Sequence, residues 1–360
     1  EAGFVTVEAL ARPEIVAMKP YSSARKEAPG EGVLLNANEA PVSLLAEGSF
    51  NRYPDPQPGQ LVERLAAMYG VSRENLLVTR GSDEGIDLLT RVFCRAGQDA
   101  ILQSPPAFGM YRIAAQTQGA AVVDVPRNSA DFSLDEDGML QALENGPSIK
   151  LVFLTSPSNP TGDLVRPAFL EKVLNAASDR ALVVVDEAYA EFCSQPSAIE
   201  LLGSYPHLVV LRTLSKAWAS AGLRCGTVIA GPEVIGLLRR IIAPYPLPSP
   251  VAALALQMLA PENLRKQQEL VQRLRANKHI LLDILKGRPF VREIYPGEAN
   301  FVLLRVDDAT GMLTACADRN VILRGFPADP ALHDCIRISV GSEKDLESLR
   351  TALDEWEESR

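Results

Sequence analysis

Four short, nearly continuous runs of Val, Leu and Ile constrain the fold of this chain more than any other feature. They span residues 151–154, 181–185, 207–211 and 226–230. Strands that are covered on both faces of a sheet have this uniform apolar character, whereas half-exposed strands alternate apolar and polar residues. Between the first two runs, residues 166–177 have the apolar spacing of a helix. The alternation of strand and helix predicts a mainly parallel α/β sheet.

Further elements follow from the same spacing. Residues 60–69 and 84–94 also have a helical pattern. The segment 242–250 holds four prolines and breaks the pattern. Beyond it we expect one long helix over about 252–285. A smaller α+β unit should then contain strands at 300–305, 321–323 and 336–340. We expect three parts in the chain: an N-terminal arm at 1–30 that belongs to the small domain, a large domain at 31–250, and a small C-terminal domain at 251–360.

Composition excludes several classes of protein. The chain has 360 residues, 47% of them hydrophobic, and a net charge of −9, which opposes nucleic acid as a partner. No apolar run approaches the roughly 20 residues that cross a bilayer, so we expect no membrane association. The five cysteines are scattered and form no CxxC pair, which indicates neither a metal site nor a disulfide framework. Reduced thiols fit a cytoplasmic enzyme.

Polar residues gather where the predicted strands end. Asn159 follows the first apolar run, Asp186 and Tyr189 follow the second, and Ser215-Lys216 follows the third. Upstream, residues 77–79 lead into Gly81-Ser82-Asp83, which opens a helix. In open α/β sheets, ligands bind beyond the carboxyl ends of the strands. These groups should therefore converge on one crevice.

Each group has a functional and a structural interpretation. A helix N-terminus at Ser82 and Asp83 suits a phosphate, although either residue could be a plain N-cap. Lys216 could be a desolvated nucleophile or half of a salt bridge. Asp186 could pair with a protonated ring nitrogen, cap a helix or bind a metal, and the last is disfavoured because no His lies near it. Tyr189 could pack or bind a ligand.

Taken together, the motifs resemble those of a known family. Ser156-Pro-Ser-Asn159-Pro-Thr-Gly162, Val185-Asp-Glu-Ala-Tyr189 and the stretch from Ser215 to Gly226 resemble the cofactor motifs of the fold-type-I aminotransferases. More narrowly, the chain resembles the histidinol-phosphate aminotransferase family. That likeness rests on further motifs over nearly the whole chain, at residues 20–21, 35–39, 51–55, 80–87, 105–111, 187–192 and 336–341.

The resemblance implies a fold and a cofactor. It implies a large domain with a mainly parallel seven-stranded sheet between helices, a smaller α+β domain and an N-terminal arm. The implied cofactor is pyridoxal 5'-phosphate, with Lys216 bonded to its aldehyde and later moving a proton. By the same likeness, Asp186 pairs with the pyridine nitrogen, and Asn159 and Tyr189 bind the ring oxygen. Phe108, where many relatives have Tyr, stacks on the ring.

The resemblance also implies ligands for two anionic groups. The cofactor phosphate is expected to bind Ser82, Asp83, Ser215 and Arg224, together with Tyr53 from a partner subunit. This arrangement implies a homodimer with shared active sites. For the substrate, the likeness implies contacts from the residues Tyr21, Asn159, Arg324 and Arg337. Two arginines and a tyrosine suit a phosphate dianion.

The implied reaction is reversible amino transfer between L-histidinol phosphate and 2-oxoglutarate, giving imidazole acetol phosphate and L-glutamate in histidine biosynthesis. Two alternatives share the chemistry: an aromatic amino acid aminotransferase and a threonine-phosphate decarboxylase. A non-catalytic regulator with the same fold would carry a helix-turn-helix module, for which there is no room before Tyr21. No GxGxxG follows a strand and no GxxxxGK[ST] occurs, which disfavours dehydrogenases and kinases.

Overall fold

A seven-stranded sheet forms the centre of the larger domain in the computed structural model, which describes residues 5–24 and 32–360. Its strand order is β1-β7-β6-β5-β4-β2-β3. Strands β2 to β6 pair in parallel, and β7 runs antiparallel to both β6 and β1. The strands are β1 (Leu76–Thr79), β2 (Ala100–Gln103), β3 (Ala121–Asp124), β4 (Ile149–Thr155), β5 (Leu182–Asp186), β6 (Leu208–Thr213) and β7 (Gly226–Ala230). The predicted seven-stranded, mainly parallel sheet is confirmed.

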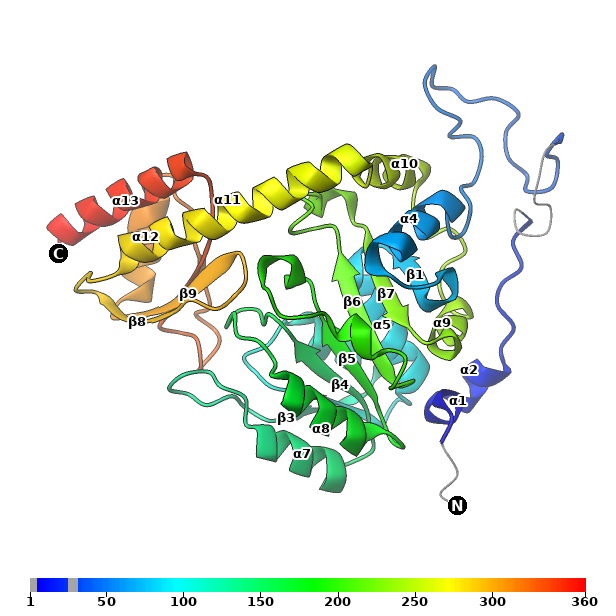
Figure 1. Cartoon of the computed structure of the whole chain (residues 1–360), viewed down its shortest axis with the longest axis horizontal. Coiled ribbons are helices and arrows are strands. Elements are labelled where there is room, and N and C mark those ends of the chain that lie inside the picture. Colours follow the sequence, from blue (N-terminus) through cyan, green and yellow to red (C-terminus); the bar gives the residue numbers. More distant parts are fainter. Residues whose placement is uncertain (1–4, 25–31) are drawn as a thin grey trace.

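Helices cover both faces of this sheet (Figure 1). Val184 of β5 packs into one core cluster, whereas its neighbours Val183 and Val185 pack into the cluster on the opposite face. This double burial explains why the strand has no polar alternation. One face is covered by α5 (Gly81–Phe93), α6 (Met110–Gln118) and α9 (Pro232–Arg239), and the other by α7 (Glu136–Asn145) and α8 (Pro167–Ala177). Helix α4 (Gly59–Tyr69) packs beside β1.

The smaller domain is built on a four-stranded antiparallel sheet with the order β10-β11-β9-β8. Its strands are β8 (Val291–Tyr295), β9 (Phe301–Val306), β10 (Arg324–Gly325) and β11 (Cys335–Ser339). Helices α12 (Ala309–Ala317) and α13 (Glu343–Glu358) pack on it. The strand predicted at 321–323 is wrong. Asn320 has a left-handed φ of 59° and Val321 N–H bonds to Cys316 O, so this segment ends α12 and the strand starts only afterwards.

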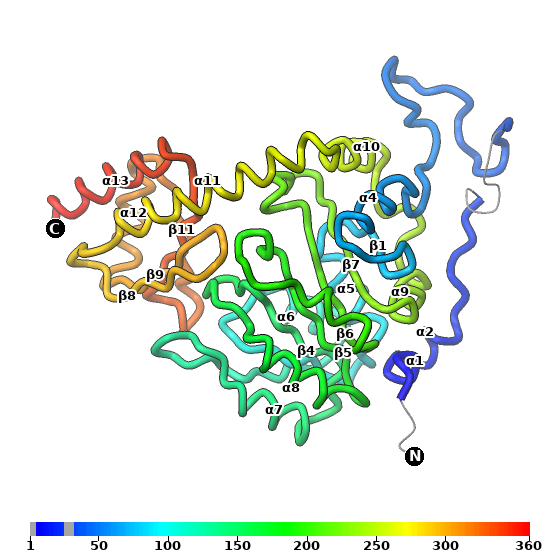
Figure 2. The backbone as a smooth tube through the Cα atoms, viewed as in Figure 1, coloured from blue at the N-terminus to red at the C-terminus, as the bar shows by residue number. Residues whose placement is uncertain are grey.

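The single helix expected over 252–285 is also wrong, because the chain forms two helices there. They are α10 (Ser249–Met258) and α11 (Pro261–Leu285). Pro261 has no N–H to continue α10, but it fits the first position of a new helix. Helix α10 packs on α4, so the core of the large domain extends beyond the expected boundary at residue 250. Helix α11 then runs from α10 to the small domain (Figures 1 and 2).

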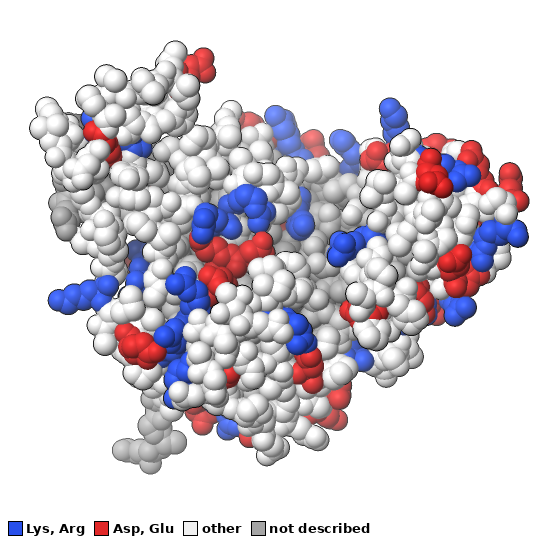
Figure 3. All heavy atoms as spheres, turned by 180° about the vertical axis from the view of Figure 1, so that it is seen from behind, with Lys and Arg blue, Asp and Glu red and all other residues white. Residues whose placement is uncertain are grey.

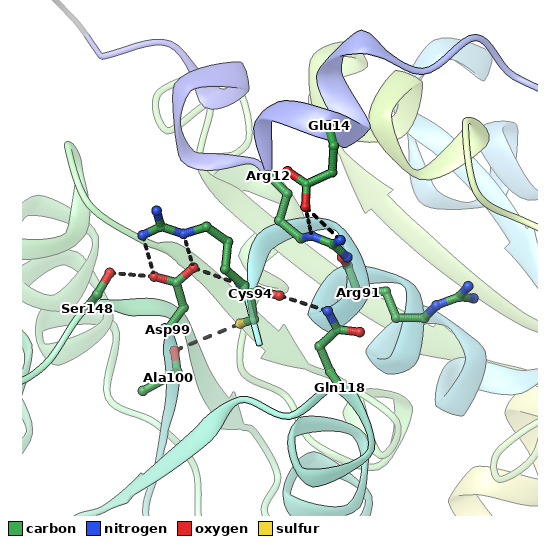
Figure 4. A network of polar contacts seen from close by, with 9 residues as sticks. Arg12, Glu14, Arg91, Cys94, Asp99, Ala100, Gln118 and Ser148 are labelled. Atoms are coloured by element: carbon green, nitrogen blue, oxygen red, sulfur yellow. Dashed lines mark hydrogen bonds and ion pairs between the residues drawn. The ribbon is translucent and has the colours of Figure 1, made fainter. Parts of the chain in front are cut away.

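The described part of the N-terminal arm lies on the large domain, which corrects the expectation that it joins the small one. Helices α1 (Val7–Leu10) and α2 (Pro13–Ala17) bury Leu10 and Ile15 in the core cluster around α5 and α9. Arg12 N–H bonds to Val92 O at 2.9 Å. The guanidinium of Arg12 donates to Arg91 O at 2.8 Å, within the network of polar contacts drawn in Figure 4. The expected boundary between residues 30 and 31 lies outside the described residues.

Short 3₁₀ helices complete the chain. They are η1 (Arg73–Asn75), η2 (Ala190–Phe192), η3 (Ala198–Leu201) and η4 (Ala221–Leu223). Of these, η2 directly follows Tyr189, and η4 directly precedes Arg224. They therefore shape two of the loops that carry predicted site residues.

Two glycines meet where the small domain rests on the loop after β4. Gly162 and Gly297 both have a left-handed backbone, with φ of 79° and 53°. A Cβ on Gly297 would lie 2.5 Å from the Cα of Gly162, so no other residue fits without displacement. Glu298 N–H donates to Gly162 O at 2.7 Å, and Lys278 Nζ donates to Gly297 O at 2.9 Å. This contact joins the small domain to the loop that carries Asn159.

Replacing Gly297 tests this contact. Gly297→Ala should lower the free energy of unfolding more than Gly287→Ala, which also lies at positive φ, 79°, but has no atom within 4 Å of a Cβ. The control variant bears only the left-handed backbone cost of about 1–2 kcal/mol. Gly297→Ala adds an overpacking cost of about 1–3 kcal/mol. Denaturant unfolding measures both, and equal losses would contradict the assigned contact.

Candidate active site

A pocket of about 590 Å³ opens at the carboxyl ends of the parallel strands. Its large-domain wall is formed by residues that end β4, β5 and β6 or follow them, and by the start of α5. The small domain closes it from the other side with residues of β10, β11 and the loop between them. The lining includes these predicted residues: Ser82, Asp83, Phe108, Asn159, Asp186, Tyr189, Ser215, Lys216, Arg224, Arg324 and Arg337.

Asp186 is the last residue of β5 and is almost completely buried. Tyr111 Oη donates to its Oδ2 at 2.7 Å, and Ala188 N–H donates to its Oδ1 at 3.2 Å. Burial raises the pKa of Asp186, and these two hydrogen bonds oppose that rise because they favour the carboxylate. A buried carboxylate at the floor of a pocket suits a cationic partner such as a protonated ring nitrogen.

Lys216 stands in the loop after β6 and is free to react. Its Nζ makes no hydrogen bond or ion pair to any residue in the described ranges, which disfavours the salt-bridge interpretation. The nearest aromatic contact places Nζ 5.7 Å from the ring centroid of Tyr189. Burial lowers the pKa of Lys216, and the positive charges of Arg337 and Arg224 lower it further. A lowered pKa increases the fraction of neutral, nucleophilic amine.

The first turn of α5 forms a corner whose groups suit an anion. Arg80 occupies the N-cap position, so Ser82 and Asp83 are helical residues rather than the caps that the structural interpretation assumed. Arg224 approaches them, with Nη2 at 3.2 Å from Asp83 Oδ2. A Cβ on Gly226 would lie 2.4 Å from Ser82 N, so β7 can approach this turn only as glycine. Backbone N–H groups, the helix dipole and a guanidinium therefore face the same space.

The small domain contributes two arginines. Arg337 of β11 donates from Nη1 to Asn159 Oδ1 at 2.5 Å and lies over the ring of Phe301 at 5.4 Å. Arg324 of β10 is its direct partner across the two strands. Burial and the neighbouring Arg324 lower the pKa of Arg337. The face shown in Figure 3 is hollowed between the two domains, and lysine and arginine side chains lie along the hollow.

Phe108 and Tyr189 line the pocket on its large-domain side. Phe108 stands just before α6 and meets the ring of Tyr111 edge-on, with centroids 5.6 Å apart. Tyr189 is buried against Phe301, with centroids 5.2 Å apart, and its burial raises its pKa to about 12. The phenol therefore stays protonated at neutral pH and can donate a hydrogen bond into the pocket.

Two predicted residues lie away from the pocket of their own chain. Tyr21 is 67% exposed and Tyr53 is 48% exposed. Tyr53 stacks on Tyr245 at a centroid distance of 4.4 Å, beside the proline-rich segment.

Two residues of the site were not predicted from the sequence. Tyr111 contacts Asp186, and Thr155 lines the pocket.

Comparison with known proteins identifies the family. The model of the aminotransferase class I and II family matches residues 21–353. The chain belongs to this family. Histidinol-phosphate aminotransferase from Yersinia pestis (strain Pestoides F) is 44% identical over 347 residues, which covers 96% of this chain and 90% of that protein. The same enzyme from Cronobacter sakazakii is 43% identical over 352 residues, covering 97% of both chains.

Solved structures agree with this membership. Histidinol-phosphate aminotransferase from Clostridium acetobutylicum superimposes with a TM-score of 0.78 at 21% identity, covering 86% of this chain and 92% of the other. The Sinorhizobium meliloti enzyme, solved in complex with pyridoxal 5'-phosphate, gives 0.74 at 26% identity, covering 86% and 84%. This protein is accordingly a fold-type-I aminotransferase that depends on pyridoxal 5'-phosphate.

The pocket of this aminotransferase fits that cofactor. Ser82, Asp83 and Arg224 line the pocket at the first turn of α5 and suit a phosphate. The Lys216 amine is available for an aldehyde, and the buried Asp186 carboxylate suits a cation. These three chemical demands belong to the phosphate, the aldehyde and the ring nitrogen of one molecule. Each of the three groups of the cofactor therefore has a suitable residue in the pocket.

The charge of Arg337 should control the reactivity of Lys216. Removing it in Arg337→Gln should raise the pKa of Lys216, because a nearby positive charge disfavours the ammonium form. The pH midpoint for labelling of Lys216 by an amine reagent in the cofactor-free protein should therefore move upward. Peptide mass spectrometry measures it. Arg265→Gln, a change on the exposed side of α11, should leave the midpoint unchanged. An unmoved midpoint in Arg337→Gln would show that the two groups do not interact.

Proposed function

We propose that this aminotransferase moves an amino group between L-histidinol phosphate and 2-oxoglutarate, forming imidazole acetol phosphate and L-glutamate in histidine biosynthesis. The observation that carries the proposal is the pair Arg324 and Arg337, which lie directly opposite each other on adjacent strands at the pocket. Like charges opposite each other in a sheet are destabilising. An anion with two negative charges would relieve that repulsion, and a phosphate is such an anion.

The relatives support the same substrate. The proteins from Yersinia pestis and Cronobacter sakazakii, at 44% and 43% identity, carry the name histidinol-phosphate aminotransferase. An aromatic amino acid offers only a carboxylate, for which one arginine would be enough. Threonine phosphate also has a phosphate, but the solved decarboxylase of that substrate, from Porphyromonas gingivalis, is 21% identical and shares the fold alone.

The proposed roles of the chain's residues follow from their chemistry. When bound, pyridoxal 5'-phosphate supplies an aldehyde and an electron-withdrawing ring. We assign to Asp186 the task of holding a proton at the ring nitrogen. We assign to Lys216 the covalent attachment of the cofactor and, once its amine is free, the transfer of the proton from the substrate's α-carbon. The lowered pKa of Lys216 favours the neutral amine that accepts this proton.

Further residues orient the two ligands. In this proposal the cofactor phosphate binds Ser82, Asp83 and Ser215 near the first turn of α5, with Arg224 beside them. Asn159 and Tyr189 donate to the ring oxygen, and Phe108 covers one face of the ring. Arg324 and Arg337 hold the substrate's phosphate, and Tyr21 closes over it.

We also propose that the enzyme is a cytoplasmic homodimer with shared active sites. The segment before α4 is poorly covered in one chain, with Val33, Leu35 and Leu44 at 88%, 89% and 100% exposure. Apolar side chains this exposed favour a protein partner. Tyr53 lies in the same region and outside the pocket of its own chain, as expected of a residue that serves a partner's phosphate site. No helix within the described ranges is long and apolar enough to cross a membrane.

A substrate panel tests the reaction. Turnover with 2-oxoglutarate should be fast for histidinol phosphate and much slower for phenylalanine, histidinol and threonine phosphate. In Arg324→Gln, the preference for histidinol phosphate over histidinol, measured as kcat/KM, should fall roughly 10- to 100-fold, the range for a lost hydrogen bond to a charged group. The change in cofactor absorbance measures turnover of each substrate by the wild type and by Arg324→Gln. A wild-type preference for phenylalanine, or release of CO₂ from threonine phosphate, would replace the proposed substrate.

Mixed dimers test the shared site. Lys216→Ala and Tyr53→Ala should each have little activity as pure proteins, because each lacks a group needed at every site. When the two are unfolded together and refolded, the hybrid dimer should contain one site with both groups intact, and part of the activity should return. Mixing Lys216→Ala with Arg224→Ala is the control, since both groups then come from the same chain and no intact site forms. Equal recovery in both mixtures would exclude the partner role of Tyr53.

A further inference from the structure

Tyr111 contacts Asp186 but does not line the pocket. It is the second residue of α6, is only 1% exposed, and stacks on Phe153 with centroids 4.4 Å apart. Its hydroxyl lies 2.7 Å from Asp186 Oδ2 and 2.6 Å from Thr155 Oγ1. The phenol thus joins the ends of β4 and β5, which are neighbouring strands. A packing role alone would need the ring but not this hydroxyl.

While Asp186 is ionised, the hydroxyls of Thr155 and Tyr111 and the Asp186 carboxylate can hydrogen-bond in only one direction. A carboxylate only accepts hydrogen bonds, so the single proton of Tyr111 must point to Asp186. The Tyr111 oxygen then accepts from Thr155, whose hydroxyl has its own proton. A directed chain runs from Thr155 through Tyr111 to Asp186. In this order the phenol of Tyr111 donates to the carboxylate, and a donated hydrogen bond favours the ionised form of Asp186.

Asp186 has little other help in staying ionised. It has no ion-pair partner within 4.0 Å among the residues that the structure describes, and the Ala188 N–H bond is long at 3.2 Å. Burial raises the pKa of Asp186, and Asp83 adds to that rise, while the Tyr111 hydrogen bond is the largest influence in the opposite direction. A neutral phenol therefore supplies the main support for a buried charge.

We propose that Tyr111 is a positioning residue that keeps the Asp186 carboxylate ionised and aimed at the ring nitrogen of the cofactor. The proposal rests on the pairing of Asp186 with that nitrogen, as assigned in the proposed function. Tyr111 touches neither cofactor nor substrate and acts only through Asp186. Thr155 orients Tyr111 in turn. The aromatic ring packs the core, and the hydroxyl serves the site.

The test compares two ligands on the cofactor-free protein. Pyridoxal 5'-phosphate and its 1-deaza analogue, in which carbon replaces the ring nitrogen, share the phosphate and aldehyde but differ in the group that meets Asp186. Wild type should bind the natural cofactor more tightly. In Tyr111→Phe the dissociation constant for the natural cofactor should rise roughly 10- to 100-fold, as expected for a lost hydrogen bond to a charged group, and that for the analogue should change little.

Matched variants separate this role from packing. Tyr69→Phe removes another buried hydroxyl, one without a hydrogen-bond partner among the described residues, and should leave both dissociation constants unchanged. Thr155→Val should reduce the preference for the natural cofactor in the same direction as Tyr111→Phe, by a smaller factor. Because the readout is a ratio within one protein, a general loss of stability cancels.

Three outcomes would overturn different parts of the argument. If Tyr111→Phe and Thr155→Val both keep the wild-type preference for the natural cofactor, Tyr111 has no positioning role. If wild type itself binds the two ligands equally, the pairing of Asp186 with the ring nitrogen fails first. Equal losses for both ligands in Tyr111→Phe would indicate a purely structural contribution.

Discussion

A sheet that is covered on both faces has only its strand ends available for polar chemistry. In this aminotransferase, residues on β5 alternate between the two core clusters until the strand stops at Asp186. The next strands in space end at Thr155 and Thr213, and the loops beyond them supply Asn159 and Lys216. Because the strands are parallel and adjacent, these groups arrive at one place without any long-range adjustment. The site is thus a consequence of the same burial that stabilises the sheet.

Burial also sets the opposing electrostatics of the site. It raises the pKa of Asp186 and lowers that of Lys216, because in each case it disfavours the charged form. The shift suits the role proposed for Lys216, which needs the neutral amine. The shift of Asp186 opposes its proposed role, and the structure compensates with hydrogen bonds from Tyr111 and the backbone. The arginines around the pocket make a local cationic region in a chain with a net charge of −9, which concentrates anionic substrates where they react.

Much of the large domain could be predicted from local patterns, because buried parallel strands have a distinctive composition. Strand β7 has the predicted bounds, and β4, β5 and β6 differ from prediction by a few residues at most. The incorrect predictions trace to single residues and to tertiary contacts. Pro261 splits the helix predicted over about 252–285 into α10 and α11. Asn320 ends α12, so residues 321–323 do not form the predicted strand. The docking of α1 and α2 depends on tertiary contacts that no local pattern records. Tyr111 was missed because a buried tyrosine has the same local signal as a packing residue.

Helix α11 connects the two halves of the molecule as a rigid rod. It starts at Pro261, beside the large domain, and its last turn, ending at Leu285, is part of the small-domain core. At a rise of 1.5 Å per residue it is roughly 37 Å long, so a tilt of about 5° at its start displaces its far end by roughly 3 Å. That displacement is comparable to the length of a hydrogen bond. A tilt of this size at Pro261 would shift β10 and β11 relative to the pocket by a distance that decides whether a hydrogen bond across it can form.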